Sequence, residues 1–549
     1  MSRVAKVALL TRSWLRDWGR YVVGTFTQVW GNPVVGREAR VRVRLSRSYF
    51  LQSLYLGFMI LIVMLVYQNV VSDEVMRNPF EAQQSLQAFH ATVMGTLTAL
   101  IVLIAPALTA NAITLERERR TMDLLAATPL TARQLLTGKL LGSLGFVLLL
   151  LALTLPVSGV SLLMGGATIR EMLETYVLIA ASAMVLCALA LFSSAYARNS
   201  TTAVFLSYLR VGLLVVVLGI MTIAQATTRL APPPGATGRE LVMPLSALSP
   251  FSAPYVADTV FNAFGLEIPG VVVGVLVCLL ATRMLLTGAA PKVGLYDKDT
   301  LPSLRRQMLL AVFLASWLSF APPVQHLIAA GGIGHGGGFG ITDILPLVGF
   351  ALPAPMPLLI LFLAPYGGQE ERRVVWNRRI RVRDMLTGKP SGSLPYILSL
   401  WFAAIAGLAL AMQPLFVLFS PEVWAYLVTL LFYYTGLWVF LWACAQLCSA
   451  LLKGRSVAAA RWLTLGCYAV LFLLPPILHM TLFSDMFMRE SPAFYLSVVY
   501  PVWGMIDTPA QRVWEVAPAF YLYGAVLWLL SLLLYVLHPR HTNQEGDVS

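Results

Sequence analysis

Long apolar runs alternate with shorter polar segments along the whole chain. A membrane-spanning helix needs about 20 mostly apolar residues, and twelve stretches of the sequence meet that requirement. They are residues 50–70, 89–113, 140–164, 173–197, 202–224, 268–288, 308–329, 342–365, 393–413, 422–449, 457–479 and 516–537. The pattern predicts an all-α integral membrane protein with about twelve transmembrane helices.

The composition separates this chain from soluble proteins. Its 549 residues are 58% hydrophobic and only 12% charged, whereas soluble chains have about 45–50% apolar and about 25% charged residues. A soluble protein with a large core would need the charged surface that is missing here. The net charge of +13 would suggest nucleic-acid binding in a soluble chain, but in a membrane protein it indicates basic loops on one face.

The basic residues orient the predicted spans. Alternate loops, beginning with the N-terminal segment, hold 32 of the 39 Lys and Arg residues, and the other loops hold six. Because positively charged loops remain on the cytoplasmic side, both termini are expected in the cytoplasm. The remaining residue, Arg210, lies inside the fifth span. We expect it to snorkel toward the cytoplasmic face, with a place on a substrate path as the alternative.

Motifs for catalysis or metal binding are not found in the sequence. There is no Walker A motif and no HExxH, and the histidines lack metal-ligand spacing. The five cysteines lie in apolar runs and fit packing roles. Ion-coupled carriers usually place carboxylates within their spans, and the predicted spans hold no such relay. We therefore expect no cofactor, metal or ATPase site in this chain.

A short repeat relates the two halves of the chain. Residues 136–144 read LTGKLLGSL and residues 386–394 read LTGKPSGSL, with seven of nine letters identical at an offset of 250. A weaker echo joins Leu245–Phe251 to Leu496–Val502 at an offset of 251. Chance recurrence of a Gly-Lys anchor at a helix entrance is the alternative to a duplication.

A duplication of six spans predicts two parallel six-helix repeats, because an even number of spans keeps both halves in one orientation. The expected domains are an interfacial N-terminal segment at 1–48, a first half at 49–290, a second half at 291–538 and a cytoplasmic tail at 539–549. Within the first segment, residues 4–30 predict an amphipathic helix in the membrane plane rather than a signal peptide. The long outer loops 225–267 and 480–515 predict short interfacial helices.

The loop between the second and third spans has the most distinctive sequence, ERERRTMDLLAATPLTARQLLTGK, at Glu116–Lys139. We expect one helix from Leu115 that ends at Ala127–Pro129, with its carboxylates near the positive end of the helix dipole. Its three arginines, Arg117, Arg119 and Arg120, are expected to be solvated or to contact lipid phosphates. Met122, Leu125 and Ala126 would form an apolar ridge, and such a helix suits a partner's groove.

This loop resembles the signature of permease subunits of the type-2 ABC transporter family, in which an E-[RK]-E cluster precedes an L-L-x-x-[TS]-P segment and then GK. Asn32–Phe50 resembles the family's lead-in to the first span, and Leu245–Asp258 its outer helices. The resemblance covers most of residues 32–288. It implies that the loop is a coupling helix that docks on an ATPase subunit through Glu116, Glu118, Met122, Leu124, Leu125, Thr128 and Pro129.

The corresponding loop of the second half, residues 370–389, departs from this signature. It lacks the L-L-x-x-T-P core and is more basic. The acidic–basic cluster has its counterpart at Glu370–Arg373, in which Glu370, Glu371 and Arg372 would take the corresponding role. This loop could dock differently, bind anionic lipid, or be basic only because cytoplasmic loops are rich in Lys and Arg. We therefore do not expect the two halves to bind an ATPase equally.

The resemblance implies a permease subunit made of two fused halves in the cell inner or plasma membrane. It would be an exporter driven by a separate ATPase subunit, expected as a dimer, which holds the ATP and Mg. The apolar spans favour a hydrophobic or amphipathic substrate. The alternatives are a secondary carrier and a non-transport scaffold or lipid-modifying protein. The missing membrane carboxylates disfavour the carrier, and the missing catalytic constellation disfavours the enzyme.

Overall fold

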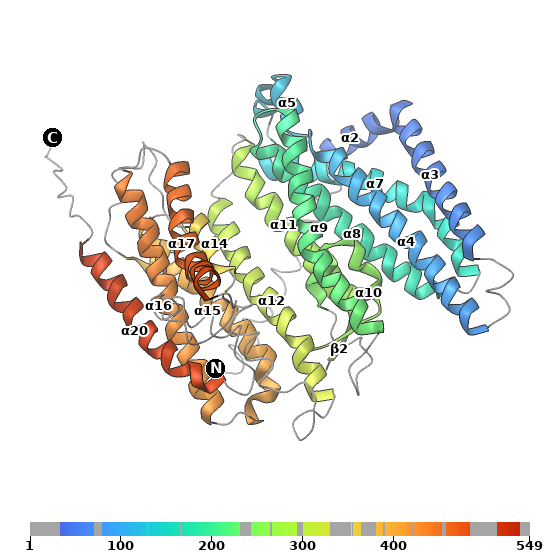
Figure 1. Cartoon of the computed structure of the whole chain (residues 1–549). Coiled ribbons are helices and arrows are strands. Elements are labelled where there is room, and N and C mark those ends of the chain that lie inside the picture. Colours follow the sequence, from blue (N-terminus) through green and yellow to red (C-terminus); the bar gives the residue numbers. More distant parts are fainter. Residues whose placement is uncertain are drawn as a thin grey trace, which may run out of the picture. The chain divides into compact units, whose positions relative to one another are not determined.

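A computed structural model of the chain describes residues 33–44, 46–70, 79–128, 130–163, 167–230, 243–263, 266–293, 300–329, 353, 355–363, 380–387, 390–418, 421–452, 457–483 and 513–537. Figure 1 shows that helices make up nearly all of the described chain. The helices form two compact units, the first reaching Leu304 and the second beginning at Arg305. The domain boundary predicted at 290/291 remains a prediction, as does the N-terminal amphipathic helix, which lies outside the described residues.

The first unit contains ten α-helices among its described residues. They are α2 (Pro33–Arg44), α3 (Ser46–Val70), α4 (Pro79–Thr109), α5 (Thr114–Glu118), α6 (Met122–Ala126), α7 (Ala132–Leu163), α8 (Ile169–Tyr196), α9 (Ser200–Leu230) and α11 (Gly270–Ala289), to which the short α10 (Ala253–Ala257) is added in the outer loop. Capping boxes at Thr131–Gln134 and Thr168–Glu171 fix the starts of α7 and α8.

Helix α8 forms the centre of the first unit and packs against α4, α7, α9 and α11. Its buried residues include five alanines and three serines, such as Ala183 and Ser182, and small side chains let neighbouring membrane helices approach closely. The serines donate hydrogen bonds along their own helix, as Ser182 Oγ does to the carbonyl of Leu178 at 2.9 Å. The buried hydroxyl groups of Ser182 and Ser193 are thus paired within their own helix.

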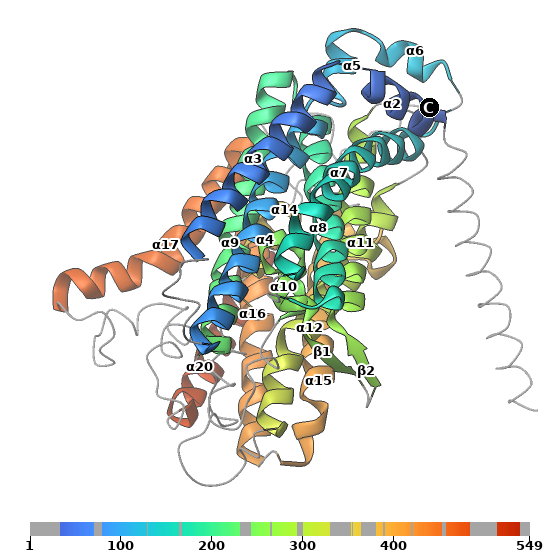
Figure 2. The same ribbon diagram turned by 90° about the vertical axis from the view of Figure 1, so that its right-hand side faces the viewer.

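The outer loop of the first unit contains the short helices that the sequence predicts, and also a β-hairpin that it does not. The described part comprises η2 (Pro244–Leu248), η3 (Pro250–Ser252), α10, and the antiparallel strands β1 (Val260–Ala263) and β2 (Leu266–Pro269). Figure 2 shows this hairpin at the opposite end of the unit from α2, α5 and α6. The two short strands are the exception to an otherwise helical unit.

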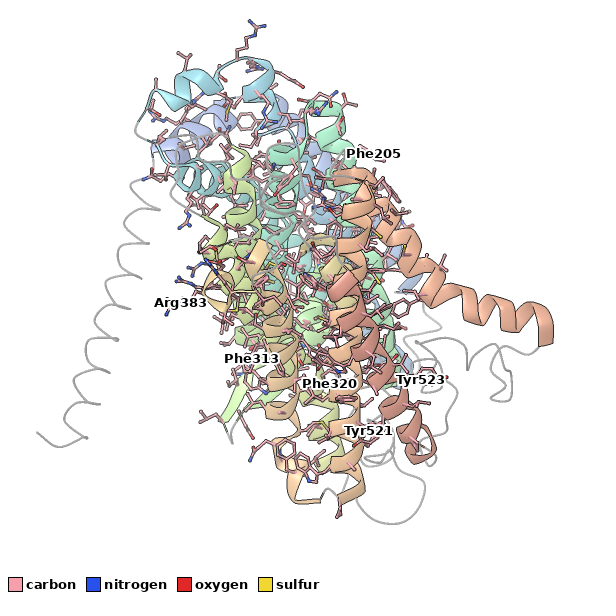
Figure 3. The ribbon with its side chains drawn as sticks, turned by 90° about the vertical axis from the view of Figure 1, so that its left-hand side faces the viewer. Phe205, Phe313, Phe320, Arg383, Tyr521 and Tyr523 are labelled. Atoms are coloured by element: carbon pink, nitrogen blue, oxygen red, sulfur yellow. The ribbon has the colours of Figure 1, made fainter. Side chains whose placement is uncertain are left out.

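The second unit contains most of α12 (Thr300–Ala329) and the described helices α14 (Met356–Leu363), α15 (Ser393–Met412), α16 (Pro421–Leu451), α17 (Val457–Phe483) and α20 (Val513–Leu537). Its described 3-10 turns are η5 (Val382–Asp384), η6 (Pro390–Gly392) and η7 (Gln413–Leu418), whereas η4 (Ala290–Lys292) belongs to the first unit. The most extensive helix–helix packing in this unit is between α16 and α20. There Phe432 lies 6.4 Å from Tyr521, which Figure 3 labels on α20. Gly436 and Gly524 allow this close approach.

Eight of the described helices are long and apolar enough to cross a membrane: α3, α4, α7, α8, α9, α11, α15 and α16. Each coincides with one of the twelve predicted spans. Shorter apolar helices at Val457–Phe472 and Tyr521–Leu534 coincide with two more. Within the predicted span 342–365, the described helix is α14. The chain is thus an all-α membrane protein, while the count of twelve and the parallel repeat remain predictions.

The repeated LTGK letters do not adopt the same local structure in the two units. In the first, Leu136–Lys139 lie inside α7. In the second, Leu386 and Thr387 form a turn, and the helix begins only at Ser393. Pro390 replaces Leu140 at this point, and proline removes a backbone donor and disfavours helix in the residue before it. One substitution within the repeat therefore accounts for the later helix start.

The packing of α8 against α11 yields the first prediction. A Cβ added at Gly274 would lie 2.7 Å from Cδ2 of Leu178 and 3.0 Å from Cβ of Ala247. We expect Gly274→Val to destabilise the first unit by about 1–3 kcal/mol through overpacking, measured as a lower thermal unfolding midpoint in detergent. The control is Gly212→Val on α9, where no atom lies within 4 Å. Equal midpoints for the two variants would contradict this packing.

Candidate functional site

The loop between α4 and α7 contains two short helices instead of the single helix predicted from Leu115. α5 ends at Glu118 because Arg120 has a φ of 56°, in the left-handed region. The N–H groups of Thr121 and Arg120 donate to the carbonyls of Glu116 and Arg117, at 3.0 and 3.1 Å. This is a Schellman ending with arginine in the place usually taken by glycine. The chain then turns before α6, and the expectation of one continuous helix is wrong.

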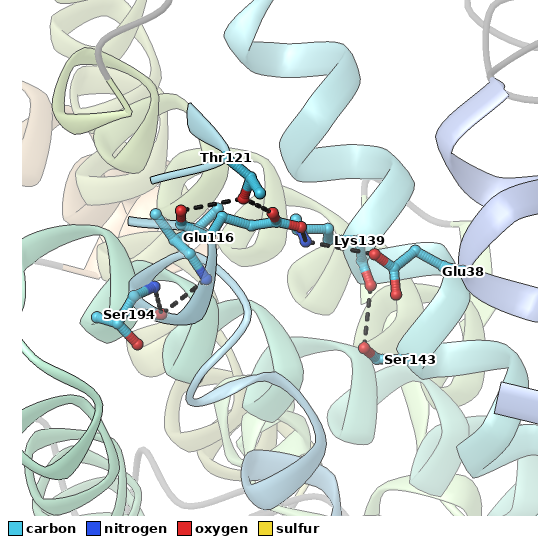
Figure 4. A network of polar contacts seen from close by, with 8 residues as sticks. Glu38, Glu116, Thr121, Lys139, Ser143 and Ser194 are labelled. Carbon is cyan, nitrogen blue, oxygen red and sulfur yellow. Dashed lines mark hydrogen bonds and ion pairs between the residues drawn. The ribbon is translucent and has the colours of Figure 1, made fainter. Parts of the chain in front are cut away.

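The N-terminus of α5 is capped by a side chain from another helix. Its own N-cap residue, Ile113, provides no side-chain acceptor. Instead Ser194 Oγ of α8 accepts hydrogen bonds from the N–H groups of Ile113 at 3.0 Å and Thr114 at 3.2 Å, as Figure 4 shows for this serine. The first N–H groups of a helix have no partner within it. Ser194 therefore fixes where α5 begins relative to α8.

Arg117 provides the reciprocal contact at the C-terminus of α8. Its guanidinium donates to the carbonyls of Ala197 at 2.6 Å, Ala195 at 3.4 Å and Lys292 at 3.2 Å. Cations are favourable at helix C-termini because the unpaired carbonyls there carry negative partial charge. The sequence predicts that Arg117 is solvated or touches lipid phosphates. That expectation is wrong, because backbone carbonyls of three residues take up its donors.

Glu118 connects α5 to the start of α9. Its carboxylate accepts from the backbone N–H of Ser200 at 2.6 Å and from the Ser200 hydroxyl at 2.8 Å. These hydrogen bonds, the backbone one first, lower the pKa of Glu118. A carboxylate at a helix N-terminus is also favoured by the helix dipole. Glu118 thus caps α9, although it lies on an exposed loop.

Lys139 joins the loop to α2 and α7. Its Nζ lies 3.1 Å from Glu116 Oε1 and 3.3 Å from Glu38 Oε1 (Figure 4). Glu116 also accepts a short hydrogen bond from the Thr121 hydroxyl. Burial acts to raise the pKa of Glu116, but this hydrogen bond and the positive charges of Lys139 and Arg37 outweigh it and lower the pKa. The three charged side chains form an ion-pair cluster at the base of the loop.

Gly142 brings α2 against α7 next to this cluster. A Cβ at Gly142 would lie 2.7 Å from Cβ of Glu38, so the two helices meet at this glycine. Val34 is buried on the same helix α2. Lys139 and Gly142 are neighbours on α7 one turn apart, and together they hold α2 by one ion pair and one close backbone approach.

The apolar side chains of α6 divide into two groups. Met122 and Leu125 pack against the core of the first unit. Leu124, by contrast, is 71% exposed. Leu115 and Thr128 are also exposed. Pro129, like the side chain of Ala126, lies outside the described residues. The exposed apolar residue is therefore Leu124 rather than the ridge of Met122 and Leu125, and the partner-binding role of all these residues remains a prediction.

The counterparts in the second unit, Glu370, Glu371 and Arg372, lie outside the described residues. The end of their loop is described from residue 380. There Asp384 accepts from the Ser391 hydroxyl at 2.6 Å, and Arg305 of α12 donates to the carbonyl of Met385 at 2.6 Å. Arg383 projects outward in Figure 3. The loop end is thus held by α12 and by itself, a pattern unlike that of the first unit.

Comparison with known proteins gives one match. Residues 33–264 match the family model of ABC-2 family transporter proteins. This part of the chain is similar to the permease domains of ABC-2 family transporters. No curated protein and no solved structure matches the chain. The matched residues include α2, the loop with α5 and α6, and the outer loop up to the hairpin, so the described cluster lies inside the family domain.

Three residues of this site were not anticipated from the sequence: Glu38, Ser194 and Ser200. The capping role of Arg117 was not anticipated either. Glu38 is 101 residues from Lys139 along the chain, and Ser194 is 81 residues from Ile113. No pattern in the sequence indicates a contact between residues so far apart along the chain. The alternation of acidic and basic residues in ERERR is the one visible hint, since Arg117 meets the C-terminus of α8 and Glu118 the N-terminus of α9. Among the described residues, no three His, Cys, Asp or Glu side chains cluster as metal ligands.

The ion-pair cluster yields the second prediction. We expect Lys139→Met to leave the carboxylates of Glu38 and Glu116 without their cation. It should destabilise the permease by about 2 kcal/mol, less than the about 3–5 kcal/mol of a fully buried pair, measured by thermal unfolding in detergent. Arg170→Met is the control, because the Arg170–Glu174 pair is exposed and exposed pairs contribute little. A neutral Lys139→Met would contradict the role of the cluster.

The left-handed residue yields the third prediction. Arg120→Gly should stabilise the loop by about 1 kcal/mol, because glycine adopts positive φ without the steric cost that other residues carry. Arg119→Gly is the matched control, since Arg119 has an ordinary φ of −79° and gains nothing from glycine. Protease resistance of the loop and the unfolding midpoint measure the effect. A gain for the Arg119 variant that equals the gain for the Arg120 variant would argue against strain at Arg120.

Proposed function

We propose that this permease is the membrane subunit of an ABC exporter and that a separate ATPase subunit docks on the loop of α5 and α6. The observation that carries the proposal is the exposed Leu124 on a loop whose Glu116, Arg117 and Glu118 are bound to neighbouring helices. An exposed apolar side chain on a short helix suits insertion into a partner's groove. The family match supports the membrane role of the subunit, and the loop geometry supports the docking position.

The contacts of α5 supply a route for movement from the loop into the membrane helices. Glu116 connects the loop to α7 and α2 through Lys139, Arg117 connects it to α8, and Glu118 connects it to α9. A displacement of the loop therefore acts on four helices together. The ATPase must contact the loop differently in its two states, because equal binding to both states would shift no equilibrium.

In this proposal six of the seven residues predicted to bind the ATPase have two different tasks, and the seventh, Pro129, lies outside the described residues. Leu124 and Thr128 are exposed and would contact the ATPase. Glu116, Glu118, Met122 and Leu125 would hold the loop in place, because each faces the permease itself. The second unit would contribute a weaker or altered contact, since its loop lacks the apolar core of the first.

The nucleotide belongs to the partner in this proposal. ATP and Mg would bind the ATPase subunits, expected as a dimer, and the permease would carry no ATPase site of its own. The cell inner or plasma membrane is the proposed location. A hydrophobic or amphipathic substrate is proposed from the apolar spans, and export from the resemblance of the first half.

Co-purification with the cognate ABC ATPase yields the fourth prediction. Leu124→Asp should abolish the complex and lower permease-stimulated ATPase activity about tenfold or more, a loss that a central apolar contact of about 1.4 kcal/mol or more can account for. The unfolding midpoint of the permease alone should not change, because Leu124 is exposed. Leu125→Asp should instead lower the midpoint, because Leu125 packs on the core.

Two further variants serve as comparisons. Leu266→Asp is the control, because Leu266 is 69% exposed on β2 at the opposite end of the unit. Val382→Asp probes the second loop, where Val382 is 71% exposed, the same fraction as Leu124. A complex that survives Leu124→Asp with full stimulated activity would refute docking at α6. Loss of the complex with Val382→Asp would show that the second loop also couples.

A further inference from the structure

An apolar cavity lies between α15 and α16 in the second unit, far along the chain from the family domain. Its volume is about 210 Å³, and η7 closes the end where the two helices are joined. In the predicted orientation this joined end faces the outer side of the membrane. The cavity therefore occupies the outer half of a helical hairpin whose two members both have the length and hydropathy of membrane spans.

The floor of the cavity is aromatic and rigid. Trp401 and Tyr434 line it and lie 5.8 Å apart, and each lies 5.7 Å from Trp438 behind them. Trp401 Nε1 donates to Thr435 Oγ1 at 3.3 Å, so its polar atom is turned to a neighbour. All three rings are almost fully buried. The floor thus presents ring faces fixed by packing, which favour an apolar occupant.

The mouth of the cavity opens toward the surroundings of α16. Trp424 and Val428 line it, one helical turn apart, and are 42% and 55% exposed. Because α16 is long and apolar enough to span the bilayer, the medium outside Val428 is hydrocarbon. Trp424, near the start of α16, lies where tryptophan is enriched at the membrane interface. What reaches this mouth is therefore the chain of a lipid rather than a water-soluble molecule.

The size of the cavity narrows the choice of occupant. Pockets for drug-sized ligands have about 300–1,000 Å³, so this cavity is too small for a whole amphipathic molecule. A dry apolar cavity of about 150 Å³ holds a single benzene ring, so this one has room for a short segment of a hydrocarbon chain. A flexible chain can enter such a space while the rest of the lipid stays in the bilayer.

We propose that the α15–α16 cavity binds one acyl-chain segment of an outer-leaflet phospholipid. The chain enters past Trp424 and Val428 and packs against Trp401, Met412 and Tyr434. Binding rests on dispersion contacts with a preformed apolar wall, because hydrocarbon gains no hydrophobic energy by moving from bilayer to protein. The proposal does not depend on ATPase docking or on the direction of transport, and it assigns to the second unit a ligand site of its own.

Photo-crosslinking of the full chain in phospholipid vesicles yields the fifth prediction. The probe is a phosphatidylcholine with a diazirine in the middle of one acyl chain, and adducts are mapped by mass spectrometry. We expect adducts to concentrate in 401–412 and 424–434. Ala409→Trp, which fills the cavity from α15, should lower labelling of these segments about fivefold or more, because a filled cavity admits no further chain.

Ala406→Trp is the matched control, because Ala406 lies on the same helix, is exposed and does not line the cavity. It should leave the labelling unchanged. If Ala409→Trp lowers the unfolding midpoint in detergent, Val428→Trp serves instead, since it obstructs the mouth at an exposed position. The proposal is overturned if labelling persists in a folded Ala409 or Val428 variant, or if adducts spread evenly over exposed positions such as Leu532. Labelling by a small aromatic diazirine but not by the phospholipid overturns it as well.

Discussion

The first unit depends on the need of every helix end for hydrogen-bond partners from outside the helix. In a membrane protein these ends meet where the chain leaves the bilayer, and each unpaired N–H or C=O is costly. Here the ends complete one another: Ser194 of α8 caps α5, Arg117 of α5 caps α8, and Glu118 of α5 caps α9. The loop is therefore part of the framework of the spans rather than an appendage to it.

This reciprocal capping changes the interpretation of the charged residues at the start of the loop. Acidic and basic residues before a coupling helix suggest direct contacts with a partner, but Glu116, Arg117 and Glu118 all turn toward the permease. The residues left for a partner are fewer and less polar, with Leu124 foremost among them. A partner that binds α6 contacts a helix that is held by the surrounding spans. Because these contacts hold the loop in place, a movement of the loop can act on several spans.

Much of this arrangement follows from the sequence, for identifiable physical reasons. Apolar runs fixed the positions of spans such as α8 and α15, because the bilayer demands continuous apolar length, and the signature of the first loop led to the family. The break at Arg120 could not be foreseen, because arginine seldom adopts positive φ. The partners of Lys139 and Ile113 come from helices about 80 to 100 residues away, and no local pattern encodes such pairs. The hairpin at 260–269 was missed because its strands are only four residues long.

The resemblance implies that α2 lies along the membrane, and its attachment would then make the membrane surface a participant in any movement of the loop. Helix α2 reads PVVGREARVRVR and carries four arginines, while its Glu38 is paired with Lys139 at the base of the loop. A shift of the loop consequently also carries positive charge along or across the layer of lipid headgroups. Each basic residue near an anionic surface is worth about 1 kcal/mol, so the lipid composition of the bilayer enters the energy difference between the resting and displaced states.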